Sequence, residues 1–190
     1  MSNDNGKTNG KLVIISGPSG SGKTTICREL AKDPRVRVSV SVTTRPPRSQ
    51  EVNGQDYYFV SEREFEKKIK EASLVEHARY LGTLYGTLRK PLEEAIEQGL
   101  IYLLEIDIQG ALQVMEGYPD AISIFILPPE EDVLKKRLTG RNTDKEQDIT
   151  ERLEIAKGEL QSSSRYKYHV VNDKLEETLD EICRILELKN

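Results

Sequence analysis

The sequence predicts an α/β fold in which a parallel sheet is flanked by helices. Short, continuous apolar runs have the length and character of strands buried on both faces. Helical patterns lie between these runs, and strands that alternate with helices pair in parallel through right-handed crossovers. A glycine-rich turn joins the first run to the first helix. The predicted core strands are Leu12–Ile15, Ile101–Ile106, Ile122–Leu127 and Tyr168–Val171.

Helix-capping residues and apolar spacing indicate the helices of this core. The first runs from about Lys23 to Lys32, directly after the glycine-rich turn. Pro129 suits the first residue of a helix that Gly140 ends, and a long helix is expected over about 148–162. The last helix carries an apolar stripe and takes Asp173 as its N-cap. The stripe consists of Leu175, Leu179, Ile182 and Leu186.

The stretch 39–99 has a different pattern and predicts a small, mostly antiparallel α+β insert between the first two core strands. Val38, Val40 and Val42 alternate with serines, as in a half-exposed strand. Ser61 and Glu64 form a capping box for a helix carrying Phe65, Ile69 and Ala72. Pro91 opens another helix, which Gly99 closes. We therefore predict a flexible tail over 1–10, a core over 11–38 and 100–190, and the insert over 39–99.

Composition excludes several functions. The 190 residues fit one compact domain, and 28 basic against 32 acidic residues leave a net charge of −4, so nucleic acid and anionic membranes are not expected partners. No apolar stretch approaches the roughly 20 residues of a membrane span. Cys27 and Cys183 lack metal-ligand spacing, which predicts buried free thiols and a cytoplasmic location.

The residues Gly17–Thr24 match the phosphate-binding pattern G-x-x-x-x-G-K-[ST] between a strand and a helix. Glycines let the backbone aim successive N–H groups at phosphate oxygens, and the next helix adds its positive end. Lys23 then reaches the β- and γ-phosphates, and Thr24 ligates Mg²⁺. We predict nucleoside-triphosphate binding by Gly17, Pro18, Ser19, Gly20, Ser21, Gly22, Lys23, Thr24 and Thr25.

One alternative to a kinase is a GTPase, because Asp107–Gly110 fits the short pattern D-x-x-G. A GTPase also needs an Asn-Lys-x-Asp segment to recognise guanine. The chain has only the scrambled fragment Asn172-Asp173-Lys174, which disfavours this alternative.

Motifs along the whole chain resemble the guanylate kinase family, in the family's order and over about residues 11–188. They are Ser41-Val-Thr-Thr-Arg-Pro-Pro-Arg48, Glu51-Val-Asn-Gly-Gln-Asp-Tyr-Tyr-Phe59, Glu76, Tyr85-Gly-Thr87, Glu105-Ile-Asp-Ile-Gln-Gly110, Lys135-Lys-Arg-Leu-Thr-Gly-Arg141, Arg152-Leu153 and Val171-Asn-Asp173. The resemblance implies the Mg²⁺-dependent reaction ATP + GMP ⇌ ADP + GDP. It also implies a P-loop NTPase-type core, a GMP-binding insert and a short lid at about 138–150.

For the acceptor, the resemblance implies that GMP contacts residues of the insert and of the strand that follows it. Two arginines around Pro46-Pro47 can present planar forks to one phosphate, and Glu76 can accept both donors of guanine. Glu105 departs from the Asp that the family often has. The implied GMP residues are Ser41, Arg45, Arg48, Tyr57, Glu76, Tyr85, Thr87, Glu105 and Asp107.

For the donor, the resemblance implies that Arg137, Arg141 and Arg152 clamp the ATP phosphates and that Asn172 contacts adenine. Lys23, Arg45 and these three arginines form the implied catalytic set. Thr24 and Asp107 are the implied Mg²⁺ residues, partly through water. Three points stay open at this stage: a non-catalytic binding module of the same family, a kinase for another nucleoside monophosphate, and dGMP as a second acceptor. The chain is expected to be a monomer or a homodimer.

Overall fold

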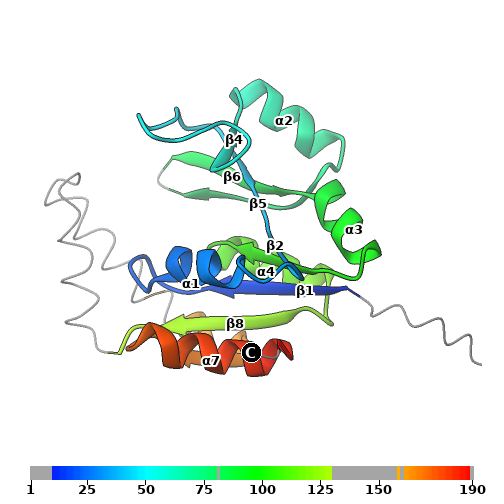
Figure 1. Ribbon diagram of the computed structural model, residues 1–190. Coiled ribbons are helices and arrows are strands. Elements are labelled where there is room, and N and C mark those ends of the chain that lie inside the picture. The colour runs from blue at the N-terminus through cyan, green and yellow to red at the C-terminus, as the bar shows by residue number, and fades with distance from the viewer. Residues whose placement is uncertain (1–9, 81, 130–157, 159–160, 189–190) are drawn as a thin grey trace, which may run out of the picture. The chain divides into compact units, whose positions relative to one another are not determined.

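The computed structural model describes residues 10–80, 82–129, 158 and 161–188, which form two compact units (Figure 1). Among the described residues, unit 1 comprises 10–13, 34–80, 82–104 and 109–121, and unit 2 comprises 14–33, 105–108, 122–129, 158 and 161–188. No helix among the described residues combines the length and the apolar character needed to cross a membrane.

The main sheet has five strands in the order β2-β7-β1-β8-β9. Val36 pairs with Ile101 and Ile124 with Tyr168, both in parallel. The central strand β1 is buried because Val13, Ile14 and Ile15 are fully covered. The strands are β1 (Lys11–Ser16), β2 (Val36–Val38), β7 (Ile101–Glu105), β8 (Ile122–Leu127) and β9 (Tyr168–Val171). The predicted α/β fold with a parallel sheet is confirmed.

The predicted strand through Val38, Val40 and Val42 is wrong in one respect, because it is two strands. β2 ends at Val38 and belongs to the main sheet, whereas β3 (Ser41–Thr43) begins a second sheet. The Ser39 N–H still donates to Leu103 O at 2.9 Å, so the chain leaves β7 only after this residue.

The second sheet lies within unit 1 and has four strands in the order β4-β3-β6-β5. β6 pairs antiparallel with both β3 and β5, and β3 pairs in parallel with β4. Phe65 of α2 packs with Val42 and Leu74 to form the core of this sheet. The strands are β4 (Tyr57–Phe59), β5 (Leu74–Tyr80) and β6 (Thr83–Leu88), and the helices of unit 1 are α2 (Glu62–Lys70), α3 (Arg89–Glu97) and α4 (Ile108–Gly117).

The capping box of α2 is confirmed, since Ser61 Oγ accepts from Glu64 N and Glu64 Oε2 accepts from Ser61 N. The predicted extension of this helix to Ala72 is wrong. Ala72 has φ 51°, in the left-handed region, and lies beyond the end of the helix. α3 begins at Arg89, so Pro91 is its third residue, where a missing N–H still costs nothing.

Unit 2 holds α1 (Lys23–Leu30) and α7 (Leu175–Leu186), which contact each other. The prediction of Asp173 as the N-cap of α7 is wrong. That position belongs to Lys174, whose side chain makes no cap hydrogen bond. Glu176 and Glu177 in the first turn place negative charge at the helix N-terminus instead. The predicted helices from Pro129 and over 148–162 lie largely outside the described residues.

Candidate nucleotide-binding site

The phosphate-binding loop is a close-packed turn that only glycine permits at two positions. Gly17 has φ 143°, and a Cβ there would lie 2.4 Å from Ile126 O. Gly22, the N-cap of α1, has φ 94°, and a Cβ there would lie 2.2 Å from Asn172 Nδ2. Either side chain would force the loop away from β8 or from Asn172. The other predicted loop residues, Pro18, Ser19, Gly20 and Ser21, form the bend between these glycines, with Ser21 N donating to Pro18 O at 3.1 Å.

The Lys23 ammonium folds back over the loop. It donates to Gly17 O at 2.7 Å and to Pro18 O at 3.0 Å. The first turn of α1 contains no acidic residue, and Thr24 and Thr25 on it are exposed. A helix N-terminus, a glycine-rich bend and an ammonium group together make an anion-binding surface.

Oxygen side chains converge beside the start of α1. The Thr24 hydroxyl donates to Glu105 Oε1 at 2.6 Å, at the end of β7. The next residue, Ile106, donates its N–H to Ile15 O at 3.3 Å, which brings the segment before Asp107 against the end of β1. Hydroxyl and carboxylate oxygens are the ligands that Mg²⁺ prefers, so this donor set fits the predicted ion.

Cys27 of α1 lies close to Glu105 and is 2% exposed. Burial first, and then the Glu105 carboxylate, raise the pKa of this thiol well above its usual value. The thiol is therefore protonated and buried, as predicted. Cys183 is also a free thiol but is only half-buried.

Asn172 is buried behind the phosphate-binding loop. Its Nδ2 donates to Ser21 O at 2.7 Å, and its Oδ1 accepts from the Thr178 hydroxyl at 3.2 Å. Both ends of the amide are thus engaged within unit 2, one of them with the loop backbone. The described contacts make Asn172 a support for the loop, while its predicted contact with adenine stays a prediction.

In unit 1, the strand register aligns predicted acceptor residues in one row across the second sheet. Ser41 on β3 pairs with Tyr57 on β4 and with Thr87 on β6, and Thr87 pairs in turn with Glu76 on β5. Directly opposed residues project from the same face of a sheet. We call Tyr57, Ser41, Thr87 and Glu76 the cross-strand row.

Glu76 ends the cross-strand row as a buried carboxylate, only 4% exposed. Its Oε1 accepts from the Thr87 hydroxyl at 2.7 Å. The single hydroxyl proton of Thr87 is thereby donated to Glu76 rather than outward. Gly86 lies on β6 beside Thr87, where a Cβ would lie 3.0 Å from Glu76 O and 3.1 Å from Phe65 Cζ. The glycine in the Tyr85-Gly-Thr87 motif thus lets Phe65 of α2 pack closely on its face of the sheet.

Arg45 lies beyond β3 in an aromatic setting. Its guanidinium carbon is 4.8 Å from the centroid of the Tyr57 ring and 5.4 Å from that of Phe59. Tyr85 contacts Tyr57 edge to face, with centroids 6.1 Å apart. Three residues predicted to hold one phosphate therefore cluster, whereas Arg48 lies on the exposed loop that follows.

Glu51 is a residue of this cluster that sequence reasoning left without a role. Arg45 Nη1 and Nη2 each donate to a Glu51 oxygen at 2.6 Å, and Arg48 N donates to the same carboxylate at 2.8 Å. These hydrogen bonds lower the pKa of Glu51 from 4.5 to about 2, and the carboxylate raises the pKa of Arg45. The sequence signal was its place three residues after Arg48 in a recognised motif.

The predicted residues fall into two groups by unit. The phosphate-binding loop, Glu105, Asp107 and Asn172 belong to unit 2, and the cross-strand row, Arg45, Arg48 and Tyr85 belong to unit 1. Glu105, predicted to contact GMP, bonds to Thr24 of α1. The predicted clamp residues Arg137, Arg141 and Arg152 lie outside the described residues.

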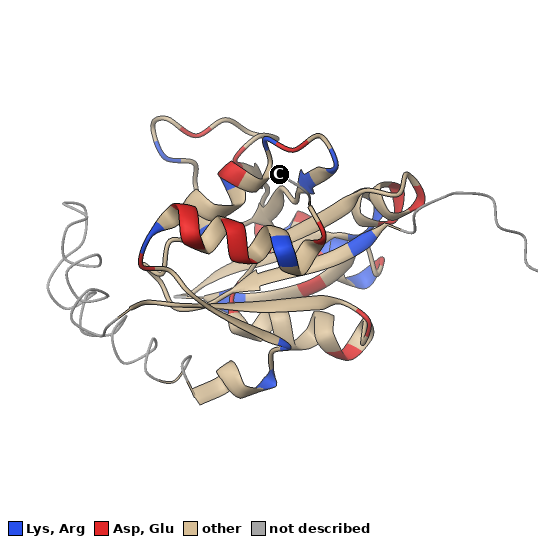
Figure 2. Cartoon of the chain, turned by 60° about the horizontal axis from the view of Figure 1, so that its bottom comes forward, with Lys and Arg blue, Asp and Glu red and all other residues tan. Residues whose placement is uncertain are grey.

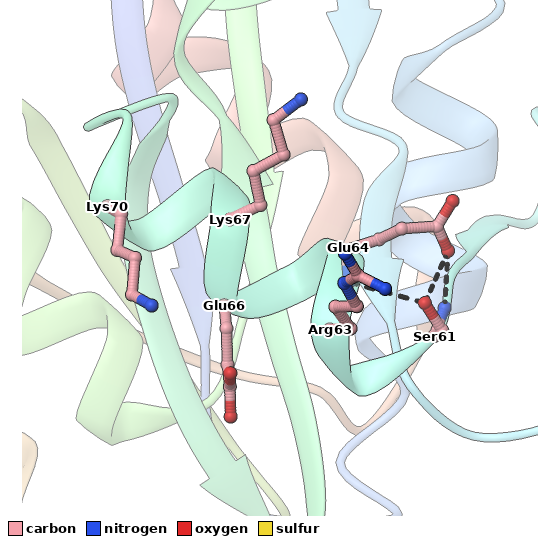
Figure 3. A pocket seen from close by; sticks show the side chains of 6 residues that line it. All are labelled: Ser61, Arg63, Glu64, Glu66, Lys67 and Lys70. Atoms are coloured by element: carbon pink, nitrogen blue, oxygen red, sulfur yellow. Dashed lines mark hydrogen bonds between the residues drawn. The ribbon is translucent and has the colours of Figure 1, made fainter.

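A hollow of about 620 Å³ lies against α2 and holds none of the predicted site residues (Figure 3). It is lined by Ser61, Arg63, Glu64, Glu66, Lys67 and Lys70. The capping box of Ser61 and Glu64 occupies one end, and charges of both signs line the rest. Across the described chain, acidic and basic residues are likewise interspersed (Figure 2). Such mixed charge is typical of a solvated helix face.

A phosphate-binding loop between β1 and α1 of a parallel sheet defines the chain as a P-loop nucleotide-binding protein. The family model described as guanylate kinase matches residues 9–189. The chain is 46% identical to guanylate kinase of Clostridium tetani, covering 93% of this chain and 85% of that protein. It is 44% identical to guanylate kinase of Synechocystis sp., covering 98% of each. The chain belongs to the guanylate kinase family.

Solved structures agree with this assignment. Guanylate kinase from Anaplasma phagocytophilum superimposes with a TM-score of 0.80 at 36% identity, over 95% of this chain and 86% of that one. Shikimate kinase from Bacteroides thetaiotaomicron matches with a TM-score of 0.52 at 14% identity, over 94% of this chain and 99% of that one. The second likeness concerns the fold alone.

Proposed function

We propose that this chain transfers the γ-phosphoryl group of ATP to GMP, giving ADP and GDP. The phosphate-binding loop supports ATP as the donor, but many enzymes share such a loop. The observation that carries the choice of acceptor is the cross-strand row, which ends in the buried carboxylate of Glu76.

Glu76 is proposed to read guanine. The base offers two adjacent donors, N1–H and the 2-amino group, and one carboxylate accepts both. Thr87 already donates to Oε1, which orients the carboxylate before the base arrives. Adenine presents an acceptor at N1, so a buried charge would lose its partner, at a cost of several kcal/mol. Ser41, in register with Thr87, is proposed to contact O6.

Arg45, Arg48, Tyr57 and Tyr85 are proposed to hold the GMP phosphate. The Arg45 fork is already planar and bidentate toward a carboxylate, the geometry that it would use toward a phosphate. Glu51 would keep the fork oriented, and the phosphate would compete with it for the same N–H donors. A phosphate monoester is largely a dianion at neutral pH, since its second pKa is about 6, and needs no general base.

The donor side is proposed to rest on the loop N–H groups, Lys23 and the arginines Arg137, Arg141 and Arg152. Lys23 would exchange its loop carbonyl partners for phosphate oxygens. Mg²⁺ would neutralise phosphate charge, and Thr24, Glu105 and Asp107 are the side chains suited to hold it, directly or through water. Closure of a lid at 138–150 would exclude water and suppress hydrolysis of ATP.

The remaining parts of the proposal concern organisation. Residues 39–99 are proposed as the GMP-binding insert, with 11–38 and 100–190 as the core. A monomer or a homodimer in the cytoplasm fits the composition and the two free thiols.

A coupled assay of ADP release tests the reaction with GMP, dGMP, AMP, UMP and dTMP side by side. We expect GMP to give the fastest release, with dGMP measured as a second acceptor. Release no faster with GMP than without it would indicate a binding module that lacks turnover. Faster release with AMP or dTMP would reassign the acceptor.

A further inference from the structure

β5, the strand that carries Glu76, lies at the edge of the second sheet and pairs with β6 on one side only. Its outer edge therefore exposes backbone N–H and C=O groups that no strand satisfies. The pairing is also irregular between Leu74 and Glu76, where the register shifts. An irregular edge strand is a poor platform for a residue that must meet a base within a few tenths of an ångström.

The side chain of Gln113 on α4 covers this edge directly after Glu76. Its Oε1 accepts from His77 N at 3.2 Å, and its Nε2 donates to His77 O at 2.8 Å. One amide thus pairs with both backbone groups of one residue, as the backbone of a neighbouring strand would. Nε2 also contacts Gln109 O at 3.3 Å, which ties the side chain to its own helix.

The segment of β5 before the register shift is also held by hydrogen bonds, from Arg89 of α3. Arg89 Nη2 donates to Leu74 O at 2.9 Å, and Nε donates to Ala72 O at 3.1 Å. Nη1 donates to Tyr118 OH, just beyond α4, at 3.0 Å. Helix-borne side chains therefore fasten β5 before and after Glu76, and Gln113 is the nearer of the two, since it binds the next residue.

We propose that Gln113 is a positioning residue for base recognition: by pairing with His77, it fixes the place from which Glu76 meets guanine. The inference rests on the proposed function, because Glu76 must be the base reader. Gln113 acts through the backbone of β5 and touches no substrate. Its loss should therefore affect recognition of the base and leave the donor nucleotide unaffected.

The test compares Gln113→Ala with Glu116→Ala, an exposed change one turn along the same helix. Both receive the same helix-favouring residue, so helix propensity is matched. We expect Gln113→Ala to raise the KM and the calorimetric Kd for GMP about tenfold, the effect of losing roughly one net hydrogen bond. The KM for ATP and kcat should stay within about twofold, and Glu116→Ala should change none of these constants.

Two further variants connect the effect to Glu76. Gln113→Glu keeps the length and the acceptor of the side chain but places a carboxylate against His77 O, so it should also weaken GMP binding. In a Glu76→Gln background, Gln113→Ala should add little, because coupled residues are not additive. Preference for GMP over the analogue lacking the 2-amino group should fall with each single change.

The outcomes separate this inference from the proposed function. A wild-type chain that neither binds nor phosphorylates GMP would overturn both. A wild-type chain that binds GMP, with Gln113→Ala and Gln113→Glu leaving the Kd and the base preference unchanged, would overturn the role of Gln113 alone. Equal losses for GMP and ATP would also overturn it, since they would indicate general damage to the fold.

Discussion

The phosphate-binding loop of unit 2 and the cross-strand row of unit 1 hold charge in opposite ways. The loop is one continuous segment, and its cation Lys23 donates to neutral backbone carbonyls. The row and its neighbours come from separate strands aligned by register, and their cation Arg45 is paired with the carboxylate of Glu51.

This difference has a consequence for anion binding. A phosphate that approaches Lys23 competes with the carbonyl dipoles of Gly17 and Pro18, whereas one that approaches Arg45 competes with the full negative charge of Glu51. Strength of binding is therefore favoured at the loop. Geometric control is favoured beside the cross-strand row, where the Arg45 guanidinium, the Tyr57 ring and the Glu51 carboxylate orient one another.

The largest effect should follow removal of the loop cation. Lys23→Met should lower kcat about 10³-fold, because a preorganised charge at the transferring phosphate contributes most to the rate. Steady-state turnover with ATP and GMP measures this, and circular dichroism checks that the fold is intact. Lys32→Met removes an exposed lysine of the same region, paired with Glu29, and serves as the control. Near-normal turnover of Lys23→Met would contradict the assignment of the loop.

The next effect belongs to the end of the cross-strand row. Glu76→Gln should lower kcat/KM for GMP about 10²-fold, because an amide accepts at one atom only and presents an N–H to the base. The KM for ATP should change little, in contrast with Lys23→Met. Glu97→Gln, which makes the same replacement of a carboxylate by an amide at an exposed position of α3, is the control. An equal rise in both KM values would argue against base reading by Glu76.

The two regions also differ in how far the sequence predicts them. The strand, loop and helix around Gly17–Thr24 follow from local pattern alone, because the glycines set the turn and the hydrogen bonds of Ser21 N and Lys23 Nζ to Pro18 O close it within a few residues. The predicted boundary between core and insert falls after Val38, but the alternating valines predicted one strand across it, because β2 and β3 differ only in their partner strands.

Contacts between distant residues explain what else was missed at the site. The resemblance supplied the members of the cross-strand row but not the residues that hold them. Gln113 and His77 are 36 positions apart, and no local sequence pattern predicts that an exposed glutamine will pair with the edge of a strand. Asp173 satisfied the residue preference of an N-cap, but the backbone of Lys174 took that position.

A smaller effect is expected at the support of the loop. Asn172→Ala should raise the KM for ATP about tenfold, because the Ser21 carbonyl loses the amide that holds the loop. Binding of pyrophosphate, which has no base, distinguishes a loss of loop support from a loss of an adenine contact. If Asn172 supports the loop, pyrophosphate binding weakens in parallel, and if it contacts adenine alone, pyrophosphate binding is unchanged. Asp173→Ala, next in the chain and exposed, is the control.

The smallest effect concerns the ion pair that distinguishes unit 1. Both side chains of the Arg45–Glu51 pair are only 16% exposed, so the pair should contribute about 1 kcal/mol to stability. The folded-state pKa of Glu51 is about 2 against an ordinary value of 4.5, so the ionised carboxylate stabilises the fold above pH 4.5. That contribution should disappear as the pH falls from 4.5 through about 2. Urea unfolding of the wild type and Glu51→Gln at neutral and acidic pH measures the difference, with the exposed Glu66→Gln as control. A difference that stays constant over this range would show that Glu51 acts through packing and not through its charge.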